Sequence, residues 1–147
     1  MIIAERSIPL CFIANLYANG IIEVIWDQSI AEVELDHMWM VRDAVKDLGK
    51  GEKMPMYIVT HGFLRINKEA KLFAASSEGQ KYTLANAVLV DNPGKRILFN
   101  FFMLFFKPAT PTQPVSNQEE AFSWLLEMKK QAAFQELSLE NQLINGR

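Results

Sequence analysis

The sequence is poor in the residues that carry most metal and thiol chemistry. It contains one cysteine, Cys11, and two histidines, His37 and His61, and these three residues lie far apart in the chain. A single cysteine cannot form an internal disulfide, and three scattered residues do not give the spacing of a zinc cluster. We therefore expect no metal site and no cofactor. Cys11 lies in an apolar run, where a buried and inert thiol is expected.

Long apolar runs and an excess of one charge are also missing. The apolar run at residues 97–106 is ten residues long and contains Asn100, whereas a membrane helix needs about 20 residues, so we expect no transmembrane segment. The net charge is −2 with both signs interspersed, which gives no electrostatic case for binding nucleic acid or an anionic membrane. Glu5 and Arg6 interrupt the apolar start without a small-residue cleavage pattern. We expect no signal peptide and a cytoplasmic protein.

Motifs of the common catalytic folds are absent as well. The sequence has no Gly-x-Ser-x-Gly elbow, no Gly-rich phosphate loop and no Gly-x-Gly-x-x-Gly fingerprint. These absences remove the usual sequence signs of hydrolases and nucleotide-dependent enzymes. We expect a protein that is not an enzyme.

The residues that are present predict one α/β domain. A chain of 147 residues with 50% hydrophobic content is long enough to build one hydrophobic core. We place the domain at residues 1–137 and a C-terminal tail at 138–147. Asn19-Gly20 separates apolar runs at residues 8–17 and 21–26, and this dipeptide predicts a β-hairpin because it favours positive φ at both central turn positions.

Helices and buried strands are expected to alternate after the hairpin. Apolar residues recur at helical spacing over residues 35–48, and short buried strands are expected at residues 56–60 and 88–90. Asn67 is the expected N-cap of a helix after the first strand, and Asp91-Asn92-Pro93 starts a helix after the second. This alternation predicts parallel strands with right-handed crossovers. The expected fold is a mixed α/β sheet with helices packed around it.

A proline-rich connector and a last helix complete the chain. Residues 107–114 contain three prolines and are expected to be extended. Ser116 and Glu119 form a capping-box pattern that predicts the start of the last helix. Residues after about 137 are expected to fray.

The helix predicted after Pro93 is apolar on almost all sides. At about 100° per residue, its large apolar side chains fall on two arcs. The first arc contains Ile97, Leu98, Phe101, Leu104 and Phe105, and the second contains Phe99, Phe102, Met103 and Phe106. Leaving one arc in water would forgo roughly 5 kcal/mol or more, a large share of a domain's net stability. We expect both arcs to be covered, either by the sheet and the last helix, or with the second arc against a second copy or an apolar ligand.

Several segments share their spacing and apolar character with one bacterial family. They are Asn19-Gly20-Ile21-Ile22, Met54-Pro55-Met56-Tyr57-Ile58-Val59, Ala85-Asn86-Ala87-Val88-Leu89-Val90, the Phe101-Phe102 helix, Lys107-Pro108 and Glu119-Glu120-Ala121-Phe122-Ser123-Trp124-Leu125. Across residues 16–128, roughly, the chain resembles SpoIIAA-like proteins of the STAS/SEC14 type, a domain family of uncharacterised function. The resemblance implies a STAS-like fold, with an N-terminal hairpin followed by parallel βα units. It also implies protein binding or small-ligand sensing rather than catalysis.

The same resemblance bears on phosphorylation. STAS domains that antagonise anti-sigma factors carry a phosphorylated serine in an Asp-Ser-Ser-Gly-like motif, which opens the helix after the second buried strand. The matching stretch in this chain is Asn67-Lys68-Glu69-Ala70, which has no hydroxyl group. We therefore do not expect a phosphorylation switch of that kind.

The carboxyl ends of the two buried strands define a candidate ligand or partner site, because open α/β sheets bind ligands at this edge. The residues expected there are Thr60, His61, Arg65, Asn67, Asp91, Asn92 and Arg96. His61 could act as a general base that Asp91 orients. In the alternative interpretation, these residues are loop and capping groups that satisfy the backbone.

Three hypotheses for function follow. The preferred one is a non-enzymatic STAS-like protein-interaction or regulatory module that forms a homodimer or binds another protein. The second is a carrier of an apolar small molecule or lipid, of SEC14-like type. The third is a small enzyme that uses His61 and Asp91. The candidate apolar interface or ligand face for the first two consists of Phe99, Phe102, Met103 and Phe106.

Overall fold

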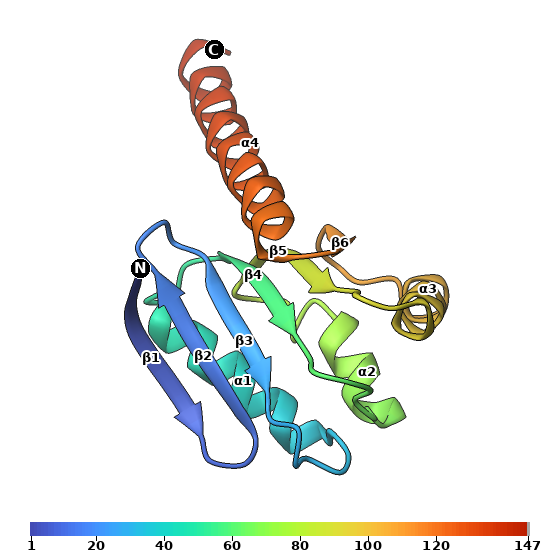
Figure 1. Ribbon diagram of the computed structural model, residues 1–147. Helices are drawn as coiled ribbons and strands as arrows, with labels where there is room; N and C mark the ends of the chain where they lie inside the picture. Colours follow the sequence, from blue (N-terminus) through green and yellow to red (C-terminus); the bar gives the residue numbers. More distant parts are fainter. Residues whose placement is uncertain (147) are drawn as a thin grey trace.

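In the computed structural model, which describes residues 1–146, six strands form one sheet and four helices surround it (Figure 1). The strands are β1 (Ile2–Ile8), β2 (Phe12–Tyr17), β3 (Ile22–Trp26), β4 (Met54–Val59), β5 (Thr83–Leu89) and β6 (Thr112–Val115). The helices are α1 (Leu35–Leu48), α2 (Lys68–Ala75), α3 (Pro93–Phe106) and α4 (Gln118–Asn145). The predicted α/β class is confirmed.

The strands lie in the sheet in the order of the chain. The pairs β1–β2 and β2–β3 are antiparallel, and β3, β4, β5 and β6 pair in parallel. The predicted hairpin joins β2 to β3, where Gly20 has a φ of +89° and the Asn19 side chain accepts a hydrogen bond from the Ile21 amide at 3.1 Å. The result is a mixed sheet with an antiparallel N-terminal half and a parallel C-terminal half.

The sequence pattern does not indicate the two edge strands. β1 precedes the expected hairpin and is exposed along most of its length, so it lacks a clear apolar alternation. β6 begins within the proline-rich connector and ends one residue after it, and Pro114 is paired with Val88 at the edge of the sheet. A proline is tolerated there because an edge strand can direct its missing N–H side away from the ladder.

Two cores form on the two faces of the sheet. One face packs against α1 and α2 through side chains such as Phe12, Val24 and Met56, all nearly inaccessible. The other face packs against the first half of α4, where Leu125 and Ala121 contact a cluster that includes Tyr57. Figure 1 shows α4 on this side, rising from the parallel half of the sheet and extending beyond it. Its first half is therefore a core helix, and its second half has left the body of the protein.

Helix starts follow local capping chemistry. Asn67 and Asn92 cap α2 and α3 as predicted, each accepting a hydrogen bond from a backbone amide three residues ahead at 2.9 Å. The prediction for α4 was wrong by one residue. Its N-cap is Asn117, which accepts from the Glu120 amide at 2.8 Å, while the Glu120 carboxylate accepts from the Ser116 amide at 2.9 Å.

The end of α4 also differs from the prediction. The helix does not fray after residue 137 but continues to Asn145. Leu139 and Leu143 continue the stripe of Ala121 and Leu125 at helical spacing, and no glycine or proline interrupts the helix before Gly146. Residues 133–145, most of them exposed, are called here the free half of α4.

α3 is the helix whose packing departs most from the prediction. It lies beside α2, and Figure 1 places it past β6, well apart from α4. The expectation that α4 covers it is wrong, because α4 packs on the opposite face of the sheet, against β4, β5 and β6. One arc of α3 is therefore left uncovered within the chain.

Candidate functional site

The carboxyl ends of β4 and β5 are joined by a buried lysine that the sequence analysis did not single out. Lys95 is 7% exposed. Its Nζ donates to the Thr60 carbonyl at 2.7 Å and forms an ion pair with Asp91 Oδ1 at 2.8 Å. The spacing of Asp91 and Lys95, four residues apart at a helix start, is the one signal in the sequence that indicates this pair.

The Lys95 ammonium group alters the titration of its partner. It lowers the pKa of Asp91 chiefly through its hydrogen bond and also through its charge, and nearby His61 lowers this pKa further. Asp91 is thus held as a carboxylate. Its bond with Lys95 fastens the first turn of α3 to the ends of both central strands.

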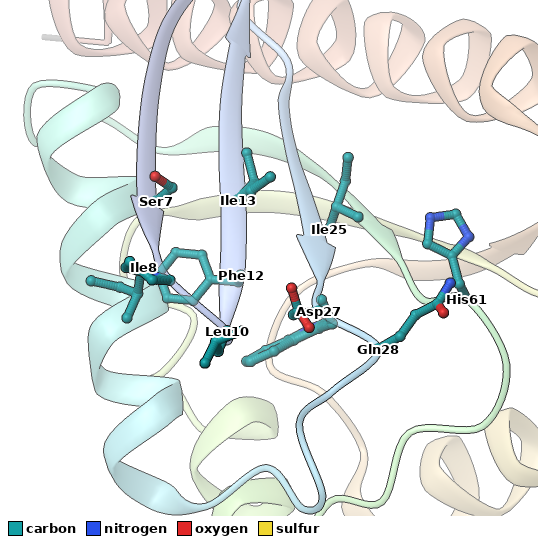
Figure 2. Close-up of a pocket in the computed structure, with 11 residues that line it drawn as sticks. Ser7, Ile8, Leu10, Phe12, Ile13, Ile25, Asp27, Gln28 and His61 are labelled. Atoms are coloured by element: carbon teal, nitrogen blue, oxygen red, sulfur yellow. The ribbon is translucent and has the colours of Figure 1, made fainter.

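His61 and Asp91 do not form the pair that an orienting role would require. Among the hydrogen bonds of residues 1–146, none joins these two side chains, and the bonded partner of Asp91 is Lys95. His61 instead lines an open hollow of about 520 Å³ over the antiparallel half of the sheet. Figure 2 shows His61 at one side of this hollow, with Ser7 and Ile13 on the neighbouring strands and Asp27 and Gln28 after β3.

The remaining predicted polar residues have structural or exposed positions. Asn67 and Asn92 are the N-caps described above. The Arg65 carbonyl accepts from the Val33 amide at 2.7 Å, joining two loops next to an isolated parallel bridge. The Arg65 and Arg96 side chains are exposed. The structure therefore brings together Thr60, Asp91 and Asn92 around Lys95, while Arg65 and Asn67 lie on a separate segment.

The outward side of α3 is an exposed apolar surface. Five large side chains are each between 54% and 66% exposed, and the Phe101 and Phe105 rings stack at 5.2 Å. These five are Ile97, Leu98, Phe101, Leu104 and Phe105, which we call the outer face of α3. A contiguous apolar patch of a few hundred Å² is, in most soluble proteins, a site of interaction.

The predicted apolar interface lies on the opposite side of the same helix. Phe99, Phe102, Met103 and Phe106 are half-buried. Phe102 and Phe106 stack at 5.4 Å, and the Lys71 ammonium group of α2 lies 6.0 Å from the Phe106 ring. This inner arc thus belongs to the packing of α3 against its own chain. Both arcs were expected to be covered, and within the chain the expectation is wrong for the first arc, which is exposed.

In the part of the chain that the structure describes, no three acidic, histidine or cysteine residues gather as metal ligands. Over the same residues, no helix is both long enough and apolar enough to cross a membrane.

A family match covers most of the domain. The family described as a domain of unknown function (DUF7793) matches residues 15–129. The chain belongs to this family. The match ends at the point where α4 leaves the sheet, so the free half of α4 lies outside the shared DUF7793 region.

Comparisons with other proteins add little to this DUF7793 assignment. No curated protein matches the chain. The chain is similar to a crystal structure of a protein of unknown function from Arthrobacter sp. FB24. The two share 21% sequence identity with a TM-score of 0.30, and the similarity covers 76% of this chain and 96% of the other.

Proposed function

We propose that this protein is a non-enzymatic, cytoplasmic STAS-like module that works by protein contact, and that the outer face of α3 is its contact surface. The observation that carries the proposal is the uncovered arc of five large apolar side chains on one helix. Burying such side chains is worth roughly 1.5 to 3 kcal/mol each, so their exposure forgoes a large stabilisation unless another molecule covers them.

The way α3 is held supports this role. Lys95 fixes its first turn to the ends of β4 and β5, and the inner arc packs toward α2. The outer face is therefore presented on a rigid element, and rigid presentation lowers the entropy lost on binding. Aromatic side chains such as Phe101 and Phe105 are also enriched at protein interfaces.

Site-specific photo-crosslinking tests the proposal. A benzophenone amino acid replaces Phe101 on the outer face in the full chain, and cells producing this variant are irradiated. A matched variant carries the same group at Leu10, which is also exposed but lies in the turn between β1 and β2. We expect covalent adducts of protein mass at position 101 that are absent at position 10.

The adduct mass separates the first two hypotheses. A protein adduct, whether of a second copy or of another chain, supports a contact module. A lipid-sized adduct at position 101 without a protein adduct would instead support the apolar-ligand hypothesis. If position 101 gives no adduct above the level at position 10, the proposed contact surface is wrong.

A further inference from the structure

The free half of α4 is a second unpartnered apolar surface on the same chain. Phe134, Leu137 and Ile144 are 73%, 60% and 72% exposed and lie on one stripe at helical spacing. Figure 1 shows this part of the helix pointing away from the sheet and away from α3. A straight 28-residue helix cannot turn back to cover the α3 of its own chain.

We propose that the free half of α4 from one copy docks antiparallel on the outer face of α3 in a second copy, and that the exchange is reciprocal in a two-fold dimer. This inference rests on the proposed function, because it names the occupant of the α3 surface. In this dimer the α4 of each copy packs on the α3 of the other copy, so the two contacts are equivalent, as a two-fold symmetric interface requires.

Charge favours this pairing. Arg96 and Lys107 flank the outer face of α3 along one side, and Glu136 and Glu140 flank the Phe134–Ile144 stripe of α4 along one side. At 100° per residue, antiparallel packing of the two apolar surfaces places both charged flanks on the same side of the contact, whereas parallel packing places them on opposite sides. The antiparallel arrangement therefore sets Arg96, and Lys107 at the C-cap of α3, on the same side of the contact as the two carboxylates.

The same geometry argues against α3 pairing with α3. In an antiparallel pair of α3 helices, Arg96 of each copy lies on the same side as Lys107 of the other. Like charges placed close together are destabilising. The free half of α4 carries the complementary charge and the apolar stripe, so it is the better-matched occupant.

The available area is sufficient for a stable dimer. The exposed parts of the side chains on the outer face of α3 and on the α4 stripe amount to roughly 1,000 Å² per contact. Two reciprocal contacts can therefore bury at most about 2,000 Å², where specific interfaces need about 1,200 to 2,000 Å².

Disulfide trapping between two variants tests the arrangement. Full-length Phe101→Cys and Leu137→Cys proteins are mixed in equal amounts and oxidised, with native Cys11 retained because it is 5% exposed. We expect disulfide-linked dimers in the mixture and few in either variant alone. Leu10→Cys mixed with Leu137→Cys is the matched control and is expected to link poorly.

Charge reversal provides an independent measurement by sedimentation equilibrium. Glu136→Lys combined with Glu140→Lys is expected to weaken wild-type self-association roughly tenfold, because it removes two exposed attractions and adds two repulsions. Arg96→Glu combined with Lys107→Glu on the partner chain is expected to restore it. Circular dichroism of each variant confirms that the helices are intact.

The outcomes separate this inference from the proposed function. If Phe101→Cys links to itself and not to Leu137→Cys, or if the charge variants leave self-association unchanged, the α4 occupant is wrong while α3 remains a contact surface. If the wild type is monomeric at about 100 µM and photo-crosslinking at position 101 captures a different protein, a second copy is not the occupant of the α3 surface. The proposed function as a contact module is then still supported. A monomer without any adduct at position 101 overturns both.

Discussion

Lys95 and Asp91 form an ion pair across the first turn of α3, with 2.8 Å between Nζ and Oδ1. The lysine is buried and also bonds the Thr60 carbonyl at the end of β4, whereas the aspartate is about half exposed. One side chain thus connects the end of a central strand to the loop after its neighbour and to the helix that follows. The outer face of α3 takes its orientation from this connection.

The Lys95 contact is expected to contribute measurably to stability. Lys95→Met keeps the apolar stem but leaves the Thr60 carbonyl without its charged donor, so we expect a loss of about 1.5 to 3 kcal/mol in the free energy of unfolding. Urea denaturation followed by circular dichroism measures it. The control is Lys68→Met, an exposed lysine with no bonded partner among residues 1–146, which is expected to change stability by less than about 0.5 kcal/mol. Equal stabilities of the two variants would show that the buried contact contributes nothing.

The lowered pKa of Asp91 predicts a pH dependence with a defined sign. Because its folded pKa lies below the unfolded value of about 3.9, the Asp91 contribution is fully present above that pH and is lost as the pH falls through the folded pKa. The stability difference between wild type and Asp91→Asn should therefore shrink as the pH falls below about 4. NMR titration of the Asp91 carboxyl should give a pKa below about 3.9, rising in Lys95→Met. A wild-type value at or above 3.9 would contradict the ion pair.

Cys11 is expected to be a slow thiol. Burial raises its pKa, and the nearby Asp27 carboxylate raises it further, so little thiolate is present at neutral pH. The rate of reaction with a thiol reagent at pH 7.5 should be well below that of an exposed cysteine introduced as Ser77→Cys, and should rise on unfolding in urea. Equal rates for the two thiols in the folded protein would exclude a buried Cys11.

Two neighbouring residues at the start of α4, Ser116 and Asn117, are expected to differ in how much their side chains stabilise the protein. Asn117→Ala removes the side chain that accepts from the Glu120 amide, and we expect a loss of about 1 kcal/mol. Ser116→Ala retains the backbone amide that Glu120 accepts from, so we expect a change of less than about 0.5 kcal/mol. Chemical denaturation of the two variants side by side measures the difference. A larger loss of stability for Ser116→Ala than for Asn117→Ala would instead support the Ser116 capping box expected from the sequence.

Local chemistry explains why so many elements could be predicted. The Asn19-Gly20 turn and the caps at Asn67 and Asn92 depend on residues within a few positions of one another, so their signals are complete in the sequence. The edge strands lack such signals: β1 has no alternating burial, and β6 contains a proline that ordinarily argues against a strand.

For the candidate site, the sequence placed Thr60, Asp91 and Asn92 at one edge but did not identify Lys95, which joins them. The burial of a lysine depends on which strand ends lie around it, and that is a tertiary property. His61 was expected to pair with Asp91 because both residues follow strand ends at that edge. The Lys95 ammonium group already pairs with the Asp91 carboxylate, and this contact depends on the tertiary structure.

The sequence by itself determined that this protein is a mixed α/β domain and that its α3 carries apolar side chains on both arcs, because helical periodicity and capping act over short distances. Only the tertiary structure decided which arc is exposed and where α4 lies. Both depend on the position of β6 at the edge of the sheet and on α4 packing on the opposite face. The apolar pattern of α3 is nearly the same all round, so no local signal could choose between its two sides.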